Sequence, residues 1–405
     1  MGVDVDVLAL RTTDGALSIP IMREPILFRS VDVASDGVSC PNQHVLVVDG
    51  LVTEIGDRVR RFPDSATIVD GPGILSSGLV DTHIHGTNGF DVMRPGDVAP
   101  MSIELLAQGI TGFLPTVVPC EPEVLLMALG GVCGDPVGAR VLGVHAEGPF
   151  LSPAQAGMFN SVHFKSYDVL LWAEMVRRSA APIILMTVAA EELQQCHIQE
   201  LQNTGVVLSL GHSDASAETT EQLFSAGILR ATHAYNAMRG FHHREPGVVG
   251  ALLSCGEVDT ELILDGLHVS QLAARVLRAT RTSGRIVLVS DRVPPAGRPS
   301  GMYVWAGRRV VVDDESVRLF SGRLAGSGGA LDAAVRRAVE WFSLSPARAL
   351  QMASEYPRAS IGVDAGGLRI GSVADLAFFD PELRPRMTVV DGVVRWTDPS
   401  LDVAL

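Results

Sequence analysis

The stretch Leu79-Val-Asp-Thr-His-Ile-His-Gly86 ends an apolar run with two histidines that one residue separates. Side chains at positions i and i+2 of a β-strand point to the same face, so the rings of His83 and His85 can reach one point. Imidazole is among the ligands that zinc and similar divalent ions prefer. The stretch therefore predicts a strand with two metal ligands at its end, although a single buried histidine is more often a satisfied core residue.

Four further apolar runs each end in a residue that can bind a metal or move a proton. They are Val141–Glu147, Val206–His212, Arg230–His233 and Ile286–Asp291. Parallel strands of a barrel bring the side chains at their ends to one face, and a carboxylate is costly to bury unless it is paired or metal-bound. We therefore predict a divalent metal site, for one or two ions, with the ligands His83, His85, Glu147, His212 and His233.

Asp291 has a different expected role, because it follows the last of these runs and precedes Arg292-Val-Pro-Pro295. A carboxylate at the end of an eighth strand can accept the proton of a water activated by a metal ion and then deliver it to a leaving amine. We therefore predict that Asp291 is the catalytic acid and base. The alternative is an aspartate that only caps a helix or a turn.

Apolar, β-branched runs alternate with segments of helical character through the middle of the chain. The expected strands lie near 78–83, 110–118, 141–147, 183–188, 206–211, 230–234, 261–265 and 285–290, and the expected helices include 167–179, 217–226 and 270–280. Such alternation indicates β-α units and a parallel sheet. Eight strands favour an α/β fold of the (β/α)8, TIM-like barrel type, and no strand is followed by the G-x-G-x-x-G motif of a Rossmann fold.

Both ends of the chain have short strands separated by turns. Asp49-Gly50 and Asp391-Gly392 are typical of two-residue hairpin turns. We predict a small β-sandwich domain built from residues 1–74 and 366–405, and a barrel domain over residues 75–365. A helical stretch near 330–360 is expected to join the barrel to the tail.

Composition limits the partners of the protein. The 405 residues carry a formal net charge of −14, which argues against nucleic acids and anionic membranes, because both need a basic surface. No apolar stretch reaches the roughly 18 residues that span a bilayer. The 5 cysteines are scattered and never in C-x-x-C spacing, which is typical of a reducing, cytoplasmic protein.

The loop Asn236–Gly247, which follows His233, contains the local cationic cluster His242-His243-Arg244. A guanidinium group matches the planar geometry of phosphate and carboxylate oxygens. The cluster therefore predicts an anionic group on the ligand, and a solvated loop is the alternative.

Several motifs together resemble the amidohydrolase superfamily and, within it, the N-acetylglucosamine-6-phosphate deacetylases. The matching segments span most of the chain from about residue 40 onward. They are Asp81-Thr-His-Ile-His-Gly86, His145-Ala-Glu-Gly-Pro-Phe-Leu151, Gly211-His-Ser-Asp-Ala215, Thr232-His-Ala-Tyr-Asn-Ala-Met238, His242-His-Arg-Glu-Pro-Gly247, Asp265-Gly-Leu-His268, Val289-Ser-Asp291, Gly322-Arg-Leu-Ala-Gly-Ser327 and Gly371-Ser-Val-Ala-Asp-Leu376.

The resemblance implies a metal-dependent hydrolase that removes the N-acetyl group of an amino sugar phosphate. Zinc is the expected ion, with Fe²⁺ or another divalent ion as alternatives. Glu147, His212 and His233 would bind one ion, and His83 and His85 would belong to a second site that only some members retain. The resemblance also implies a cytoplasmic homodimer in which Arg244 reaches the neighbouring site. The residues matching substrate contacts are Asn236, Ala237, Arg244 and His268.

Two positions depart from the pattern of these deacetylases. The family usually has a histidine where this chain has Phe159, and a phenyl ring cannot donate a hydrogen bond to the scissile carbonyl. Arg292 stands where a small residue usually follows the catalytic aspartate. Phe159 and Arg292 therefore predict a reshaped substrate pocket, which leaves the deacylation of a different N-acyl compound open. A non-catalytic scaffold on the same fold is the third alternative.

Overall fold

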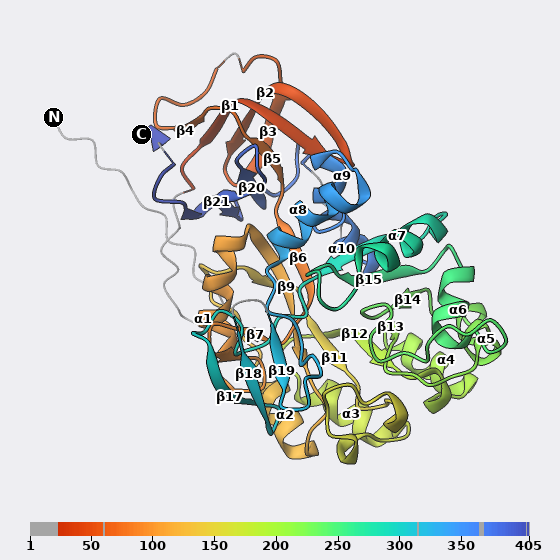
Figure 1. The fold of residues 1–405 in the computed structure, drawn as a ribbon. Helices are drawn as coiled ribbons and strands as arrows, with labels where there is room; N and C mark the ends of the chain where they lie inside the picture. The colour runs from red at the N-terminus through yellow and green to blue at the C-terminus, as the bar shows by residue number, and fades with distance from the viewer. Residues whose placement is uncertain (1–22, 60, 314–315, 364–367, 402, 405) are drawn as a thin grey trace.

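The computed structural model describes residues 23–59, 61–313, 316–363, 368–401 and 403–404. Its largest unit is a nearly closed parallel barrel, and the eight predicted strands form it in chain order (Figure 1). The barrel strands are β6 (Leu79–Ile84), β9 (Ile110–Val117), β11 (Val144–Glu147), β12 (Ile183–Val188), β13 (Val207–Leu210), β14 (Arg230–Ala231), β15 (Asp259–Ile263) and β16 (Ile286–Val289). The predicted TIM-like fold is thus confirmed.

Helices follow the barrel strands in sequence and cover the barrel. They are α1 (Val98–Glu104), α2 (Pro122–Gly130), α3 (Val169–Arg178), α4 (Gln195–Asn203), α5 (Ala217–Ser225), α6 (Gly247–Ser254), α7 (Gln271–Thr280) and α8 (Leu331–Phe342), with α9 (Pro346–Gln351) and α10 (Glu355–Ser360) after them. Helices α3, α5, α7 and α9 begin at side-chain caps, which accept hydrogen bonds from otherwise unpaired backbone N–H groups. The capping residues are Asp168, Ser216, Ser270 and Ser345.

Strands from both ends of the chain form one β domain beside the barrel, where β20 and β21 lie next to the N-terminal strands (Figure 1). Its strands are β1 (Ile26–Ser35), β2 (Val38–Val48), β3 (Leu51–Gly56), β4 (Thr67–Asp70), β5 (Ile74–Ser77), β20 (Leu376–Phe379), β21 (Pro385–Val390), β22 (Val393–Thr397) and β23 (Val403–Ala404). The sheet branches at β1, which pairs with β2, β4 and β5 around a separate apolar core. Both predicted turns, Asp49-Gly50 and Asp391-Gly392, have positive φ at each residue, as a type I′ turn requires.

The first and last barrel strands meet next to the predicted catalytic aspartate. The backbone N–H of Asp291 donates to the carbonyl of His83 (2.9 Å), and the backbone N–H of His85 donates to the carbonyl of Arg292 (2.8 Å). These two bonds fix the ends of β6 and β16 relative to each other. The closure of the barrel therefore sets the distance between the histidine pair and Asp291.

A three-stranded antiparallel sheet follows the barrel, and the sequence did not predict it. It consists of β17 (Gly301–Trp305), β18 (Arg308–Val312) and β19 (Val317–Leu319). Its inward side chains, among them Trp305 and Val310, share an apolar cluster with Phe159 and Val293. The sheet thus packs against the end of the barrel that carries the predicted site. Among the described helices, not one combines the length and the apolar character that a membrane crossing requires.

Candidate metal centre

The predicted ligands are buried together at the carboxyl ends of the barrel strands. The side chain of Glu147 lies between two pairs of histidines, and each of its two carboxylate oxygens faces one pair. Oε1 lies 3.1 Å from Nε2 of His212 and 3.0 Å from Nε2 of His233. Oε2 lies 3.5 Å from Nε2 of His83 and 3.3 Å from Nε2 of His85. The five side chains therefore form two groups of possible metal ligands that have Glu147 in common.

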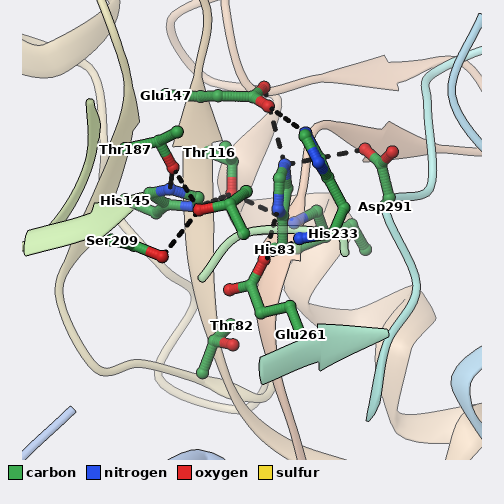
Figure 2. Close-up of polar contacts among 12 residues, drawn as sticks. Thr82, His83, Thr116, His145, Glu147, Thr187, Ser209, His233, Glu261 and Asp291 are labelled. Atoms are coloured by element: carbon green, nitrogen blue, oxygen red, sulfur yellow. Dashed lines mark hydrogen bonds and ion pairs between the residues drawn. The ribbon is translucent and has the colours of Figure 1, made fainter. Parts of the chain in front are cut away.

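Asp291 lies next to His83 (Figure 2), on the side of the cluster where His85 also contacts it. Its Oδ1 atom is 3.1 Å from Nε2 of His85 and 3.6 Å from Nε2 of His83. Burial alone would raise the pKa of Asp291, but the two imidazoles outweigh that effect and lower it. The carboxylate is therefore ionised at neutral pH and able to accept a proton.

The buried polar atoms of the cluster fit a cation. His83 Nε2 and Glu147 Oε2 have no hydrogen-bond partner among the residues that the structure describes. A buried polar atom without a partner is costly, and a metal ion would satisfy both atoms. Imidazole nitrogens and carboxylate oxygens are the donors that suit zinc and related divalent ions.

Three of the four imidazoles are oriented by an acceptor that lies behind the ring. In each case the Nδ1 atom faces a protein oxygen, so that Nε2 is turned towards Glu147. The acceptors are the Glu261 carboxylate for His83 (3.0 Å), the Thr116 carbonyl for His85 (3.0 Å) and the Gln155 carbonyl for His212 (2.8 Å). Such partners fix the ring and its tautomer in metal sites.

In the protein without a metal, the cluster attracts protons. Burial lowers the pKa of His85, but the Asp291 and Glu147 carboxylates outweigh burial and raise it to about 9. The pKa of Glu147 shifts in the opposite direction. Burial alone would raise this pKa, but His83, His212 and His233 hold it well below its usual range. A cation and protons would therefore compete for the same atoms.

Beside the cluster, a chain of hydroxyl groups extends from His145 (Figure 2). Its Nε2 atom lies 2.8 Å from Thr187 Oγ1, which lies 2.8 Å from Thr232 Oγ1, and Thr232 donates to Ser209. Burial and the neighbouring His83 keep the pKa of His145 well below its ordinary value, so this ring is neutral. It is a hydrogen-bonded part of the barrel core and belongs to neither of the two ligand groups.

Glu261 and Arg230, which the sequence analysis did not assign, form an ion pair in the same layer. Arg230 Nη2 donates to Glu261 Oε1 (2.7 Å), and both side chains are buried. Burial alone would raise the pKa of Glu261, but Arg230 and His83 hold it well below its usual range. All five residues of β15 are buried, and a buried acidic residue such as Glu261 needs a partner, but the polar sequence Asp259-Thr-Glu-Leu-Ile263 does not reveal this burial.

A pocket of about 480 Å³ opens over the cluster. The candidate ligands His85, Glu147, His212 and His233 line it. The other predicted site residues along it are Phe159, Asn236, Ala237, His268 and Asp291. The loop 153–159 forms one side, and Arg323, Leu324 and Gly326 form another. Nearly all predicted contact residues are therefore brought to one cavity.

Phe159 and Trp305 give this pocket an aromatic wall. The Phe159 ring centroid lies 5.4 Å from that of His212, and the Trp305 centroid lies 5.4 Å from that of His85. Two arginines of the sheet region hold the Phe159 loop, since Arg308 donates to the Phe159 carbonyl (3.2 Å) and Arg323 donates to the Gly157 carbonyl (2.7 Å). Trp305 could not be predicted from the sequence, because only the tertiary structure brings β17 to the site.

Two predicted arginines lie outside the pocket. Arg292 does not line it, and its guanidinium group instead donates to Thr87 Oγ1 (2.8 Å) and to the Gly328 carbonyl (2.6 Å). The expectation that Arg292 reshapes the pocket was therefore wrong, because its side chain turns back to join loops at the barrel end. Arg244 is exposed, with its Nη1 atom 2.8 Å from Nε2 of His243.

A family model described as "Amidohydrolase family" matches residues 74–395. The chain belongs to the amidohydrolase family. This amidohydrolase is therefore a metal-dependent hydrolase, in agreement with the two groups of candidate ligands. The match includes every residue of the cluster, and the predicted superfamily is confirmed.

Named relatives make the comparison more specific. The amidohydrolase is 36% identical to the N-acetylgalactosamine-6-phosphate deacetylase of Escherichia coli O157:H7, over 85% of this chain and 93% of the relative. It is 30% identical to the N-acetylglucosamine-6-phosphate deacetylase of Bacillus subtilis (strain 168), over 94% of this chain and 100% of that relative. A solved structure of a mutant N-acetyl-D-glucosamine-6-phosphate deacetylase from Mycobacterium smegmatis, in complex with N-acetyl-D-glucosamine-6-phosphate, superposes with a TM-score of 0.84 at 26% identity, over 92% of this chain and 100% of that chain.

Proposed function

We propose that this amidohydrolase removes the acetyl group from an N-acetylated amino sugar 6-phosphate. The observation that carries the proposal is the pocket that Asp291 and four of the five candidate ligands line together with Asn236 and His268. Relatives at 30% and 36% identity carry the names of deacetylases for the glucosamine and galactosamine forms of such a substrate. Both forms are therefore candidate substrates.

We propose that Glu147, His212 and His233 hold one divalent ion, and that His83 and His85 with Glu147 hold a second. Zinc is the proposed ion, because four imidazoles and a shared carboxylate suit it. When bound, the ion supplies a Lewis acid that polarises the amide carbonyl and makes an attacking water more acidic. The unpartnered atoms His83 Nε2 and Glu147 Oε2 support this assignment.

Asp291 is the proposed acid and base of the reaction. Its ionised carboxylate would accept a proton from the attacking water as the new C–O bond forms at the acetyl carbon. The same carboxyl group would then return that proton to the amide nitrogen as the C–N bond breaks. The products are acetic acid and the free amine of the sugar phosphate, and the acid then ionises to acetate as the amine takes up a proton, so atoms and charge balance.

The sugar phosphate is proposed to bind in the same pocket. Asn236, Ala237 and His268 line it, and Arg244 stands exposed on its loop, away from the pocket of its own chain. We therefore propose a homodimer in which Arg244 completes the phosphate site of the neighbouring subunit. The five free cysteines suit a reducing compartment such as the cytoplasm.

A second candidate, an amide with a bulkier or more apolar acyl group, is favoured by the aromatic wall. Phe159 and Trp305 are both almost fully buried beside the metal cluster. The phenyl ring of Phe159 has no donor for the charge that develops on a carbonyl oxygen. An acyl group with apolar atoms would gain more from burial against this wall than a small polar one.

The test is an assay of zinc-loaded protein for release of carboxylate and amine. The panel contains N-acetylglucosamine-6-phosphate, N-acetylgalactosamine-6-phosphate, the two sugars without phosphate, and the N-propionyl and N-butyryl forms of both phosphates. Turnover of a phosphorylated N-acetyl sugar above all others supports the first proposal. Preference for the longer acyl groups supports the second, and no hydrolysis of any compound contradicts both.

A further inference from the structure

Glu261 forms an ion pair with Arg230. It lies next to His83, on the side of that ring away from Glu147 (Figure 2). Its Oε2 atom is 3.0 Å from Nδ1 of His83. The same oxygen accepts a hydrogen bond from the backbone N–H of His233 (3.3 Å). One buried carboxylate therefore contacts one residue from each of the two groups of candidate ligands.

The partner of His83 differs in charge from the partners of two other rings. His85 and His212 have neutral backbone carbonyls behind Nδ1, whereas His83 has a carboxylate. A carboxylate in this position keeps the proton on Nδ1 and makes the opposite nitrogen a stronger donor to a metal. His83 Nε2 is that opposite nitrogen, and it is buried and has no hydrogen-bond partner among the described residues.

The charge of Glu261 is held in place from behind. Arg230 Nη2 donates to Glu261 Oε1 (2.7 Å) and to Thr82 Oγ1 (2.9 Å), and its Nη1 donates to Ser360. A buried carboxylate is retained only where such a partner compensates its desolvation. The arrangement fixes Glu261 firmly enough to fix the His83 ring in turn.

From this geometry we infer that Glu261 is a positioning residue that gives the site its capacity for a second ion, through the Nδ1 atom of His83. The inference rests on the proposed metal site and is independent of which amide is hydrolysed. Arg230 and Glu261 act as one unit, in which the arginine holds the carboxylate and the carboxylate holds the imidazole. The first ion, at Glu147, His212 and His233, depends on Glu261 only through a backbone N–H group.

The decisive variant is Glu261→Gln, which keeps the shape of the side chain. The glutamine oxygen can still accept from Arg230, but its NH2 group then faces Nδ1 of His83 and favours the tautomer with the proton on Nε2. Zinc titration of the full-length, chelator-treated protein, followed by calorimetry and metal analysis, should show one tight ion as in the wild type. Affinity for the second ion should fall by about 10-fold to 100-fold.

Two further variants separate positioning from simple loss of stability. Glu261→Asp keeps a carboxylate on a shorter side chain, and its second-ion affinity should lie between those of the wild type and Glu261→Gln. Ser360→Ala removes one hydrogen bond of Arg230 without contact with His83, and it should bind both ions as the wild type does. In the zinc-loaded wild type, the Nδ1 proton of His83 should also give a low-field resonance that Glu261→Gln lacks.

Unchanged affinity for both ions in a folded Glu261→Gln protein would overturn the inference, and so would an equal loss of both ions. If Glu261→Gln does not fold, Glu261→Asp decides, because it should weaken the second ion alone. Wild-type affinity for the second ion in Glu261→Asp would then overturn the inference. A failure to hydrolyse amino sugar phosphates would contradict the proposed substrate but would leave these measurements unaffected.

Discussion

The Asp291 carboxylate lies 3.1 Å from Nε2 of His85, across the seam between the last and the first strand of the barrel. The seam is closed by backbone hydrogen bonds on both sides of this contact. A proton acceptor and a candidate metal ligand are therefore held together by the backbone of the barrel itself. This relationship places the proposed acid and base next to the candidate metal ligands and leads to the first prediction.

Asp291→Asn should lower kcat by about 10²-fold or more, because an amide can neither accept nor return the proton. Asparagine tolerates the left-handed backbone of this position, where φ is 47°. The bound zinc should remain, since neither candidate group of three ligands includes Asp291. The check is steady-state kinetics together with metal analysis. An Asp291→Asn protein with wild-type kcat would contradict the assigned role.

His212→Ala should remove the tighter ion and nearly all activity, because it deletes one of three side chains that surround the same point. His85→Ala should instead reduce the amount of bound metal from two ions towards one in excess zinc. Metal analysis after dialysis against zinc buffers distinguishes the two variants. Full metal content in His212→Ala would show that the ion is held elsewhere.

Phe159→His should raise turnover of a phosphorylated N-acetyl sugar by about 10-fold or more, because it restores a hydrogen-bond donor near the scissile carbonyl. Phe159 lines the pocket beside His212, so an imidazole there faces the same space. Phe159→Leu is the matched control, since it changes the shape of the wall without adding a donor. Equal rates for the histidine and leucine variants would argue against a missing donor.

His268 should titrate above its ordinary pKa of 6.5. Burial lowers the pKa of this imidazole, but Asp265, whose Oδ2 lies 2.7 Å from Nδ1, outweighs burial and raises it. The ion pair therefore stabilises the fold fully at pH below 6.5, and this contribution is lost as the pH rises through the higher pKa of the folded protein. Proton NMR of the imidazole should show the raised pKa, and Asp265→Asn should lower it. A His268 pKa that is equal in both proteins would contradict the pairing.

Arg292→Met should affect stability more than substrate binding. The Arg292 side chain joins Thr87 to the Gly328 carbonyl and does not line the pocket. Loss of these buried, charge-assisted hydrogen bonds should lower the free energy of unfolding by about 2–3 kcal/mol. Urea unfolding measures this change, with KM measured in parallel. A large rise in KM with unaltered stability would instead show that Arg292 takes part in substrate binding.

The barrel, the cluster of candidate metal ligands and the joining of strands from both ends of the chain could be predicted from the residues alone. Most barrel strands are short apolar runs, and each candidate ligand stands near the end of a strand, so periodicity and order were enough to predict which side chains meet. Glu147 could be predicted because a carboxylate in an apolar run needs a strong partner. The turns at Asp49-Gly50 and Asp391-Gly392 were equally local, since two residues fix their conformation.

The residues that lie next to the cluster come from distant segments and could not be predicted without the folded structure. Glu261 faces His83, and Trp305 faces His85, across contacts between segments far apart in the sequence. The direction of the Arg292 side chain could not be predicted for the same reason. Its position beside Asp291 follows from the sequence, but its guanidinium group turns towards the acceptors Thr87 and Gly328, which lie on other loops. A strand pattern fixes which face a residue occupies, whereas the partner it meets there depends on how distant segments pack.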